Sequence, residues 1–133
     1  MKKLSYLLML AIVFILSACS SNTPSAVAEK FTQHINDNEF EDAVEMLYVK
    51  PGLEADQVAK DKENIVKMLT ELSKKKTDKD IATSIEATNE TLNEAGDEAT
   101  VTVKMTMKDG KTDENNVRLK KDENGDWKVM LGK

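Results

Sequence analysis

The chain has 133 residues, the length of a single domain, and a formal net charge of −5 at pH 7. Charged residues make up 32% and hydrophobic residues 40% of the sequence, which excludes a disordered acidic tail and a bundle of membrane spans. The 24 acidic residues outnumber the 19 basic ones, which argues against nucleic acid as a partner. A single cysteine excludes an internal disulfide and a cysteine-based zinc site.

The first 18 residues have the pattern of a bacterial export signal. Lys2 and Lys3 form a positively charged n-region, and residues 4–18 carry no charge. This uncharged stretch is shorter than the roughly 18 apolar residues that a membrane-spanning helix needs. We therefore predict that residues 1–18 are a signal peptide that is removed on export.

The end of this segment, Leu16-Ser17-Ala18-Cys19, resembles the lipobox of bacterial lipoproteins at all four positions. The resemblance implies that Cys19 carries a thioether-linked diacylglycerol and that the chain is cut just before it. Two or more acyl chains anchor a protein stably, since each buried methylene contributes about 0.8 kcal/mol. Residues 19–24 would then be a lipidated tether and residues 25–133 one domain. The alternative is a plain secretory signal that ends near a cysteine.

The residue after the cysteine bears on localisation. Ser20 stands where an Asp typically retains lipoproteins in the inner membrane of double-membraned bacteria. The resemblance therefore implies a place on the outer membrane facing the periplasm, or on the outer face of the membrane in a single-membraned cell. The membrane is thus an expected partner, reached through the lipid on Cys19.

Three helices are expected in the first half of the domain. Thr23 and Pro24 form a typical helix start, and a stripe of Val27, Phe31 and Ile35 follows at helical spacing. Asn38, with Glu41 three residues later, predicts the capping box of a second helix that ends before residues 51–52. The buried face of this second helix would hold Phe40, Ala43, Val44 and Leu47.

The third expected helix spans residues 55–73, with its strongest apolar stripe at Ile65, Met68, Leu69 and Leu72. A run of three lysines at residues 74–76 follows its C-terminal end, where positive charge complements the helix dipole. This run is either an anion-binding patch or a solvated helix end, and we favour the solvated helix end.

The second half of the domain changes to strand periodicity. Apolar and polar residues alternate over residues 99–107, and again over 117–120 and 127–131. Residues 81–92 form a weaker strand, and the turn sequences between the strands favour antiparallel hairpins. The predicted fold class is α+β, with about three N-terminal helices packed on a bent four-stranded antiparallel sheet.

Two segments, AEKFTQHINDNEFEDAVEML and VRLKKDENGDWKVML, together with the order of elements, resemble the nuclear transport factor 2-like (cystatin-like) superfamily. Within it, the sequence is similar to small bacterial lipoproteins that carry a domain of unknown function. The resemblance implies a cone, in which the bent sheet wraps a helix. Residues 81–91 and 112–120 are expected to form short strands, which would make this cone shallow.

Enzymes of this superfamily, such as ketosteroid isomerase, place a carboxylate base inside the cone. If the odd-numbered strand residues of this chain face the helices, the inner wall is wholly apolar. Its members would be Val101, Val103, Met105, Met107, Val117, Leu119, Trp127, Val129 and Leu131. We therefore expect that the protein is not an enzyme and that it has no catalytic residue and no cofactor. The alternative is a small isomerase or dehydratase that uses His34 or a carboxylate assigned to the wrong face.

Four residues are candidates for binding a ligand. Met105 and Met107 suggest an adaptable apolar pocket, Trp127 could stack on a ligand, and Tyr48 could place its hydroxyl at the pocket mouth. Each has a structural alternative, which is core packing for the methionines and Trp127, and a packed ring with a solvated tip for Tyr48. No metal is expected, because the acidic turn at residues 122–126 lacks the spacing of a calcium loop.

These observations favour a membrane-anchored lipoprotein of the cell envelope. Its small non-enzymatic domain would bind either a small apolar ligand or an envelope protein. A third interpretation is a homodimer through the outward Thr and Lys rows of the sheet.

Overall fold

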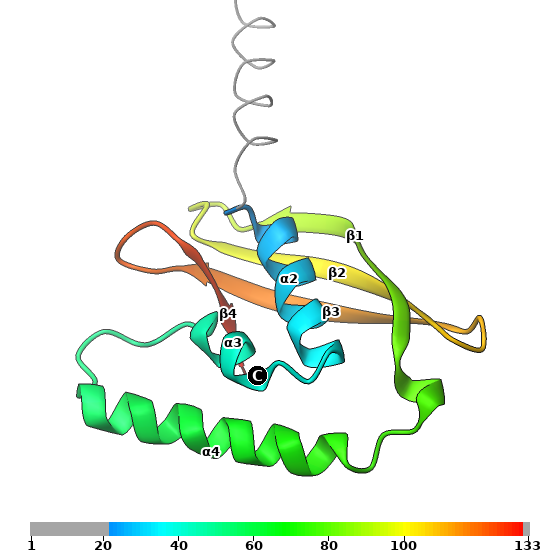
Figure 1. Cartoon of the computed structure of the whole chain (residues 1–133). Helices are drawn as coiled ribbons and strands as arrows, with labels where there is room; N and C mark the ends of the chain where they lie inside the picture. Colours follow the sequence, from blue (N-terminus) through cyan, green and yellow to red (C-terminus); the bar gives the residue numbers. More distant parts are fainter. Residues whose placement is uncertain (1–21, 132–133) are drawn as a thin grey trace, which may run out of the picture.

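The computed structural model describes residues 22–131, so the predicted signal peptide and Cys19 lie outside it. The helical elements are α2 (Pro24–Asn36), α3 (Phe40–Glu45), α4 (Ala55–Ser73) and the 3₁₀ helix η1 (Asp78–Asp80). The strands are β1 (Ala82–Leu92), β2 (Glu98–Met107), β3 (Thr112–Lys121) and β4 (Trp127–Met130). The strands form one antiparallel sheet in the order of the sequence, and the helices lie on one side of it (Figure 1). This confirms the predicted α+β fold class.

Helix α2 begins as its sequence predicts. The Thr23 side-chain oxygen accepts a hydrogen bond from the Ala26 N–H at 3.2 Å, and Pro24 occupies the first helical position. The helix then crosses the sheet and contacts all four strands. Its buried face, which includes Val27 and Ala28, closes the core from the helix side.

Polar side chains of α2 dock the helix on the edge strand β1. The pairing of β1 with β2 shifts register after Ala82 and again after Ala87. The Asn36 side chain accepts from the Ala82 N–H at 2.8 Å and donates to the Ala82 carbonyl at 3.0 Å. Glu29 Oε1 accepts from the Ala87 N–H at 2.8 Å. These bonds supply backbone groups of β1 with the partners that a buried edge needs.

The helix α3 differs from its prediction at both ends. Asn38 has a left-handed backbone with φ of 60° and does not cap the helix, because the N-cap position falls on Glu39. The helix ends at Glu45, well before residues 51–52. The chain leaves the helix there because Leu47 forms a parallel β-bridge with Val129 on the free edge of β4. The predicted capping box and the predicted length were therefore wrong.

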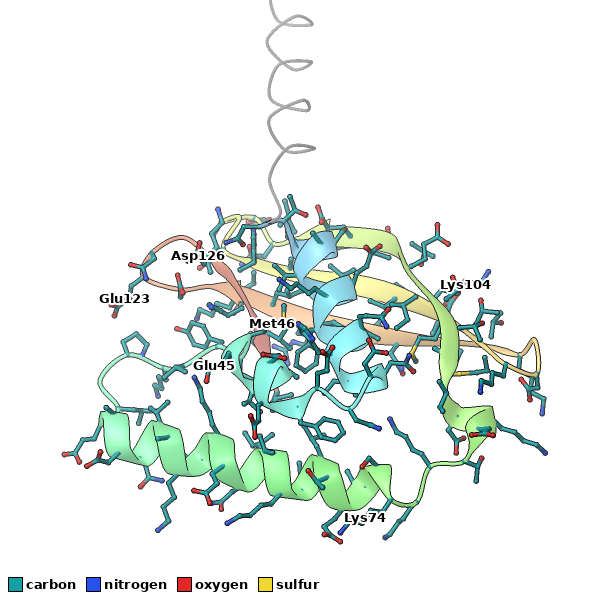
Figure 2. All side chains as sticks on the ribbon, in the orientation of Figure 1. Glu45, Met46, Lys74, Lys104, Glu123 and Asp126 are labelled. Atoms are coloured by element: carbon teal, nitrogen blue, oxygen red, sulfur yellow. The ribbon has the colours of Figure 1, made fainter. Side chains whose placement is uncertain are left out.

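Helix α4 has the predicted bounds, but none of its residues is buried. Its main contacts are with α3, and it lies on the side of α3 away from the sheet (Figure 1). Ile65 and Val66 pack against the margin of the core, whereas Met68 and Leu72 of the predicted stripe are 53% and 50% exposed. Side chains spread from α4 into solvent along its length, as Lys74 does just beyond its end (Figure 2). Between residues 22 and 131, no helix is both long and apolar enough to cross a membrane.

The core lies between α2, α3 and the concave face of the sheet. Val101, Val103 and Leu119 are fully shielded from solvent. The prediction that odd-numbered strand residues face the helices holds for these side chains, and for Trp127 and Val129. It was wrong for Leu131, which follows the end of β4 and is 54% exposed. The prediction of short strands was also wrong, since β1 has 11 residues and β3 has 10.

The beginning of the described chain is fixed to the β3–β4 hairpin. Asn22 Nδ2 donates to Asp126 Oδ1 at 2.6 Å, and Asn22 Oδ1 accepts from the Trp127 N–H at 2.9 Å. Close by, Ser25 donates from its N–H and its hydroxyl to Glu90 near the end of β1. The β1–β2 turn joins the same end of the sheet, because the Lys121 N–H donates to the Asp97 carbonyl at 2.9 Å.

Candidate ligand-binding cavity

A cavity of about 810 Å³ opens at the other end of the sheet. Its walls are the C-terminal half of α2, the segment 76–80 between α4 and β1, and the β2–β3 hairpin. Figure 1 shows η1 and this hairpin at the same end of the molecule. The volume lies within the roughly 300–1,000 Å³ of small-molecule sites.

The floor of the cavity is apolar. It is formed by five half-buried side chains from α2, β2 and β3: Phe31, Ile35, Met105, Met107 and Val117. These positions continue the two stripes that fill the core, one along α2 and one along the concave face of the sheet. At this end α3 and α4 do not cover them, and the continued stripe becomes the floor of an open cavity.

The rim of the cavity is charged, with Lys76, Lys79 and Lys111 facing Asp80, Asp109 and Asp113. Two of these carboxylates are already occupied. Asp80 accepts hydrogen bonds from the Thr77 N–H at 2.9 Å and the Thr77 hydroxyl at 3.2 Å. These bonds, the backbone one foremost, hold the pKa of Asp80 below its ordinary value, and the charge of Lys76 adds to the effect.

Asp109 and Lys111 satisfy each other within the tip of the hairpin. Asp109 Oδ1 accepts from the Lys111 N–H at 3.0 Å, and the Lys111 ammonium lies 3.9 Å from Asp109 Oδ2. Asp113 Oδ1 accepts from the Glu114 N–H at 3.0 Å. Within residues 22–131, neither Lys76 nor Lys79 forms an ion pair.

The structure separates the four predicted ligand-binding residues into two groups. Met105 and Met107 line the cavity, side by side on the concave face. Trp127 is 7% exposed within the core, with the Lys121 ammonium 5.2 Å from the centre of its ring. Tyr48 lies beside β4, where its N–H donates to Val129, and the Lys120 ammonium is 5.5 Å from its ring. Trp127 and Tyr48 therefore do not belong to this cavity.

The prediction of a wholly apolar inner wall was wrong at this end of the sheet. Asp113 and Asn115 share the face of β3 that carries Val117, and both line the cavity. The strand starts at Thr112, so continuing the odd-numbered alternation back from Val117 would have found them. Lys76, at the end of the predicted lysine run, also reaches the rim, whereas Lys74 pairs with Glu71 at 2.9 Å.

A second cluster lies where α2 meets α3. The His34 Nδ1 atom is 3.1 Å from Glu39 Oε1, and one ligand atom each from His34, Glu39 and Asp42 lies within 4.8 Å of the others. These are the described residues that could hold a divalent cation. Sequence spacing did not reveal Glu39 as the carboxylate that orients His34, because it follows the end of the helix. His34 is half-buried and does not line the cavity.

Comparisons with known proteins agree with this architecture. The fold is similar to the crystal structure of a "Putative NTF2-like transpeptidase" from Campylobacter jejuni, with a TM-score of 0.64 over 79% of this chain and 94% of that one. At 18% identity this likeness shows the fold alone, which is that of nuclear transport factor 2-like (NTF2-like) proteins. No curated protein matches the sequence. The profile of a domain of unknown function, DUF4878, matches residues 17–130, so the chain belongs to the DUF4878 family.

Proposed function

We propose that this protein is a membrane-anchored lipoprotein of the cell envelope whose NTF2-like domain binds a small ligand. The observation that carries the proposal is the cavity of about 810 Å³ between α2, the segment 76–80 and the β2–β3 hairpin. Its apolar floor and charged rim are the combination that small-molecule sites use for affinity and orientation.

The proposed anchor is the lipid on Cys19. The lipobox at residues 16–19 supports it, and so does Asn22, the first residue that the structure describes, which is hydrogen-bonded to the domain three positions after Cys19. Export would place the domain in the envelope, on the outer membrane facing the periplasm or on the outer face of a single membrane.

Binding without catalysis is favoured by the state of the polar groups around the cavity. Asp80 is a weakened base because its hydrogen bonds with Thr77 lower its pKa. His34, the base considered for an isomerase, is not among the lining residues. A small isomerase or dehydratase is the second candidate, and the observation that favours it is Asp113 on the cavity wall next to Met105.

The first experiment is native mass spectrometry of residues 20–133 purified from bacterial periplasm. This fragment retains every described contact, because the core and the hydrogen bonds of Asn22 with Asp126 and Trp127 lie within residues 22–131. We expect an additional mass on the domain. The same spectra report whether the domain is a monomer or a dimer.

A matched pair of variants places the ligand. Met107→Trp narrows the cavity over its apolar floor and is expected to lower the intensity of the additional mass, whereas Met68→Trp makes the same change on the exposed side of α4 and should retain it. A bare wild-type domain, or an additional mass of equal intensity in the two variants, would contradict the proposal.

The anchor has a test of its own. Cys19→Ser in the full chain is expected to abolish the incorporation of labelled palmitate and to release the protein from membranes. Unchanged labelling and membrane association would disprove the lipobox assignment without affecting the cavity.

A further inference from the structure

We propose that the cavity takes an amphiphile with an apolar chain and an anionic head, and that Lys76 and Lys79 bind the head. The inference rests on the proposed ligand-binding function and specifies the chemical class of the ligand. It follows from three features of the cavity. These are its apolar floor, the hydrogen bonds and ion pair that its carboxylates already make, and the position of Lys76 and Lys79, which form no ion pair within residues 22–131.

The floor selects the apolar part of the ligand. All five floor residues are aliphatic, aromatic or thioether side chains, and each remains partly exposed at this end of the sheet. Covering them removes apolar surface from water, which contributes about 25 cal/mol per Å². Met105 and Met107 are flexible and polarisable, so they can adapt to a chain without a fixed shape.

The rim selects the charge of the head. The formal charges of its three lysines and three aspartates cancel, but the groups are not equally free. Asp80 stays charged near Lys76, but its Oδ2 is already held by Thr77, and the Lys111 ammonium lies 3.9 Å from Asp109 at the tip of the hairpin. Lys76 and Lys79 remain as cations without a carboxylate in contact among residues 22–131.

The fold of the segment 76–80 keeps these two lysines at the rim. The hydrogen bonds of Asp80 with Thr77 form a capping box around η1, which fixes the chain between the two lysines. The third carboxylate, Asp113, stands on a different wall, on β3. An anionic head therefore has a preferred position against Lys76 and Lys79, with its chain over the floor.

The test compares four ligands of equal chain length by isothermal titration calorimetry with residues 20–133, each below its micelle concentration. They are dodecanoate, dodecyl phosphate, dodecanol and dodecyltrimethylammonium. We expect the better of the two anions to bind at least about tenfold more tightly than dodecanol, as one charge-assisted hydrogen bond would provide. The relative affinities of dodecanoate and dodecyl phosphate distinguish a fatty acid from a phosphate-headed lipid as the natural source.

The double variant Lys76→Gln with Lys79→Gln should bind the anion about tenfold more weakly and leave dodecanol binding unchanged. The control, Lys74→Gln with Lys75→Gln, removes the same charge from residues that do not line the cavity and should leave both affinities unchanged. The loss in the first variant should shrink at high salt, because the lysines are exposed.

The inference and the proposed function fail in different ways. Equal binding of dodecanol and both anions, or equal losses in the two double variants, would overturn the anionic head and leave the cavity as a binding site. Preferential binding of dodecyltrimethylammonium would also overturn it. A bare domain in native mass spectrometry, together with no binding of any of the four probes, would overturn both.

Discussion

The two longer helices of this domain have similar amphipathic sequences, but only one of them packs on the sheet. Helix α2, with 13 residues, contacts all four strands and supplies buried residues to the core. Helix α4, with 19 residues, buries none and contacts mainly α3. The difference teaches that an apolar stripe alone does not dock a helix. The helix that is docked also carries polar side chains, Glu29 and Asn36, that match the backbone of β1.

The attachment of α4 to the rest of the domain is correspondingly slight. Ile65 and Val66 touch the margin of the core, and the Lys62 ammonium pairs with Glu45 of α3 at 3.2 Å. Figure 2 shows Glu45 at the end of α3. A partly exposed ion pair contributes about 1 kcal/mol at most. Stability should therefore be sensitive to changes in α2 and insensitive to changes in α4.

The largest effect is expected from placing a carboxylate on each helix. Val27→Asp puts an uncompensated charge into the core and should lower the free energy of unfolding by about 3–5 kcal/mol. Met68→Glu puts one on the exposed side of α4 and should change it by less than about 0.5 kcal/mol. Urea denaturation followed by circular dichroism measures both. Equal losses would show that α4 is packed as tightly as α2.

A smaller effect on stability is expected from replacing one asparagine in each helix with alanine. Asn36→Ala leaves the N–H and carbonyl of the buried Ala82 without their partner and should cost about 1–3 kcal/mol. Asn64→Ala on the exposed surface of α4 should instead be neutral or stabilising by about 0.5 kcal/mol, since Ala is the better helix former. Thermal unfolding of the two variants tests the contrast. A neutral Asn36→Ala would remove the proposed docking role.

The N-caps provide a third comparison. Thr23→Ala removes the cap of α2 and should cost about 1 kcal/mol. Glu54, at the N-cap of α4, makes no capping bond, so Glu54→Ser should stabilise α4 by about 0.5–1 kcal/mol. Native-state hydrogen exchange should show the gain as slower exchange within α4. Faster exchange in α4 after Glu54→Ser would contradict this.

The smallest effect concerns the segment after α4. Because Thr77 lowers the pKa of the Asp80 carboxyl in the folded state, the charged form of Asp80 stabilises the fold. This contribution is present above the unfolded pKa of about 4 and is lost as the pH falls through the lower, folded pKa. The free energy of unfolding of Asp80→Asn, measured by urea denaturation, should therefore be lower than that of wild type at neutral pH. The two values should converge in acid.

Local signals in the sequence predicted much of the fold. Thr23 and Pro24 start α2, the bounds of α4 agree with its pattern, and the alternation over residues 99–107 gives β2. The early end of α3 was not predictable, because its cause is a bridge from Leu47 to Val129, far along the chain. The exposure of α4 was not predictable either, because the concave face had already been covered by α2 and α3.

The cavity was predicted in part. Alternation placed Met105 and Met107 on the inner face, and they line the cavity. Asp113 was missed because the alternation was followed only from Val117. Lys79 was missed for a different reason, since only the reversal of the chain at η1 brings it to the rim.

If Cys19 carries the proposed lipid, the two hydrogen bonds of Asn22 would also determine which end of the domain is tethered to a membrane. Two residues lie between Cys19 and Asn22, so Cys19 and Asn22 are about 10 Å apart at most. The acidic turns at 93–97 and 122–126 would then lie at the tethered end, because Asn22 bonds Asp126 and the Lys121 N–H bonds the Asp97 carbonyl. The cavity lies at the opposite end of the ten-residue strand β2, which is about 30 Å long. With the proposed anchor, the mouth of the cavity would open at the end of the domain that is not tethered to the bilayer.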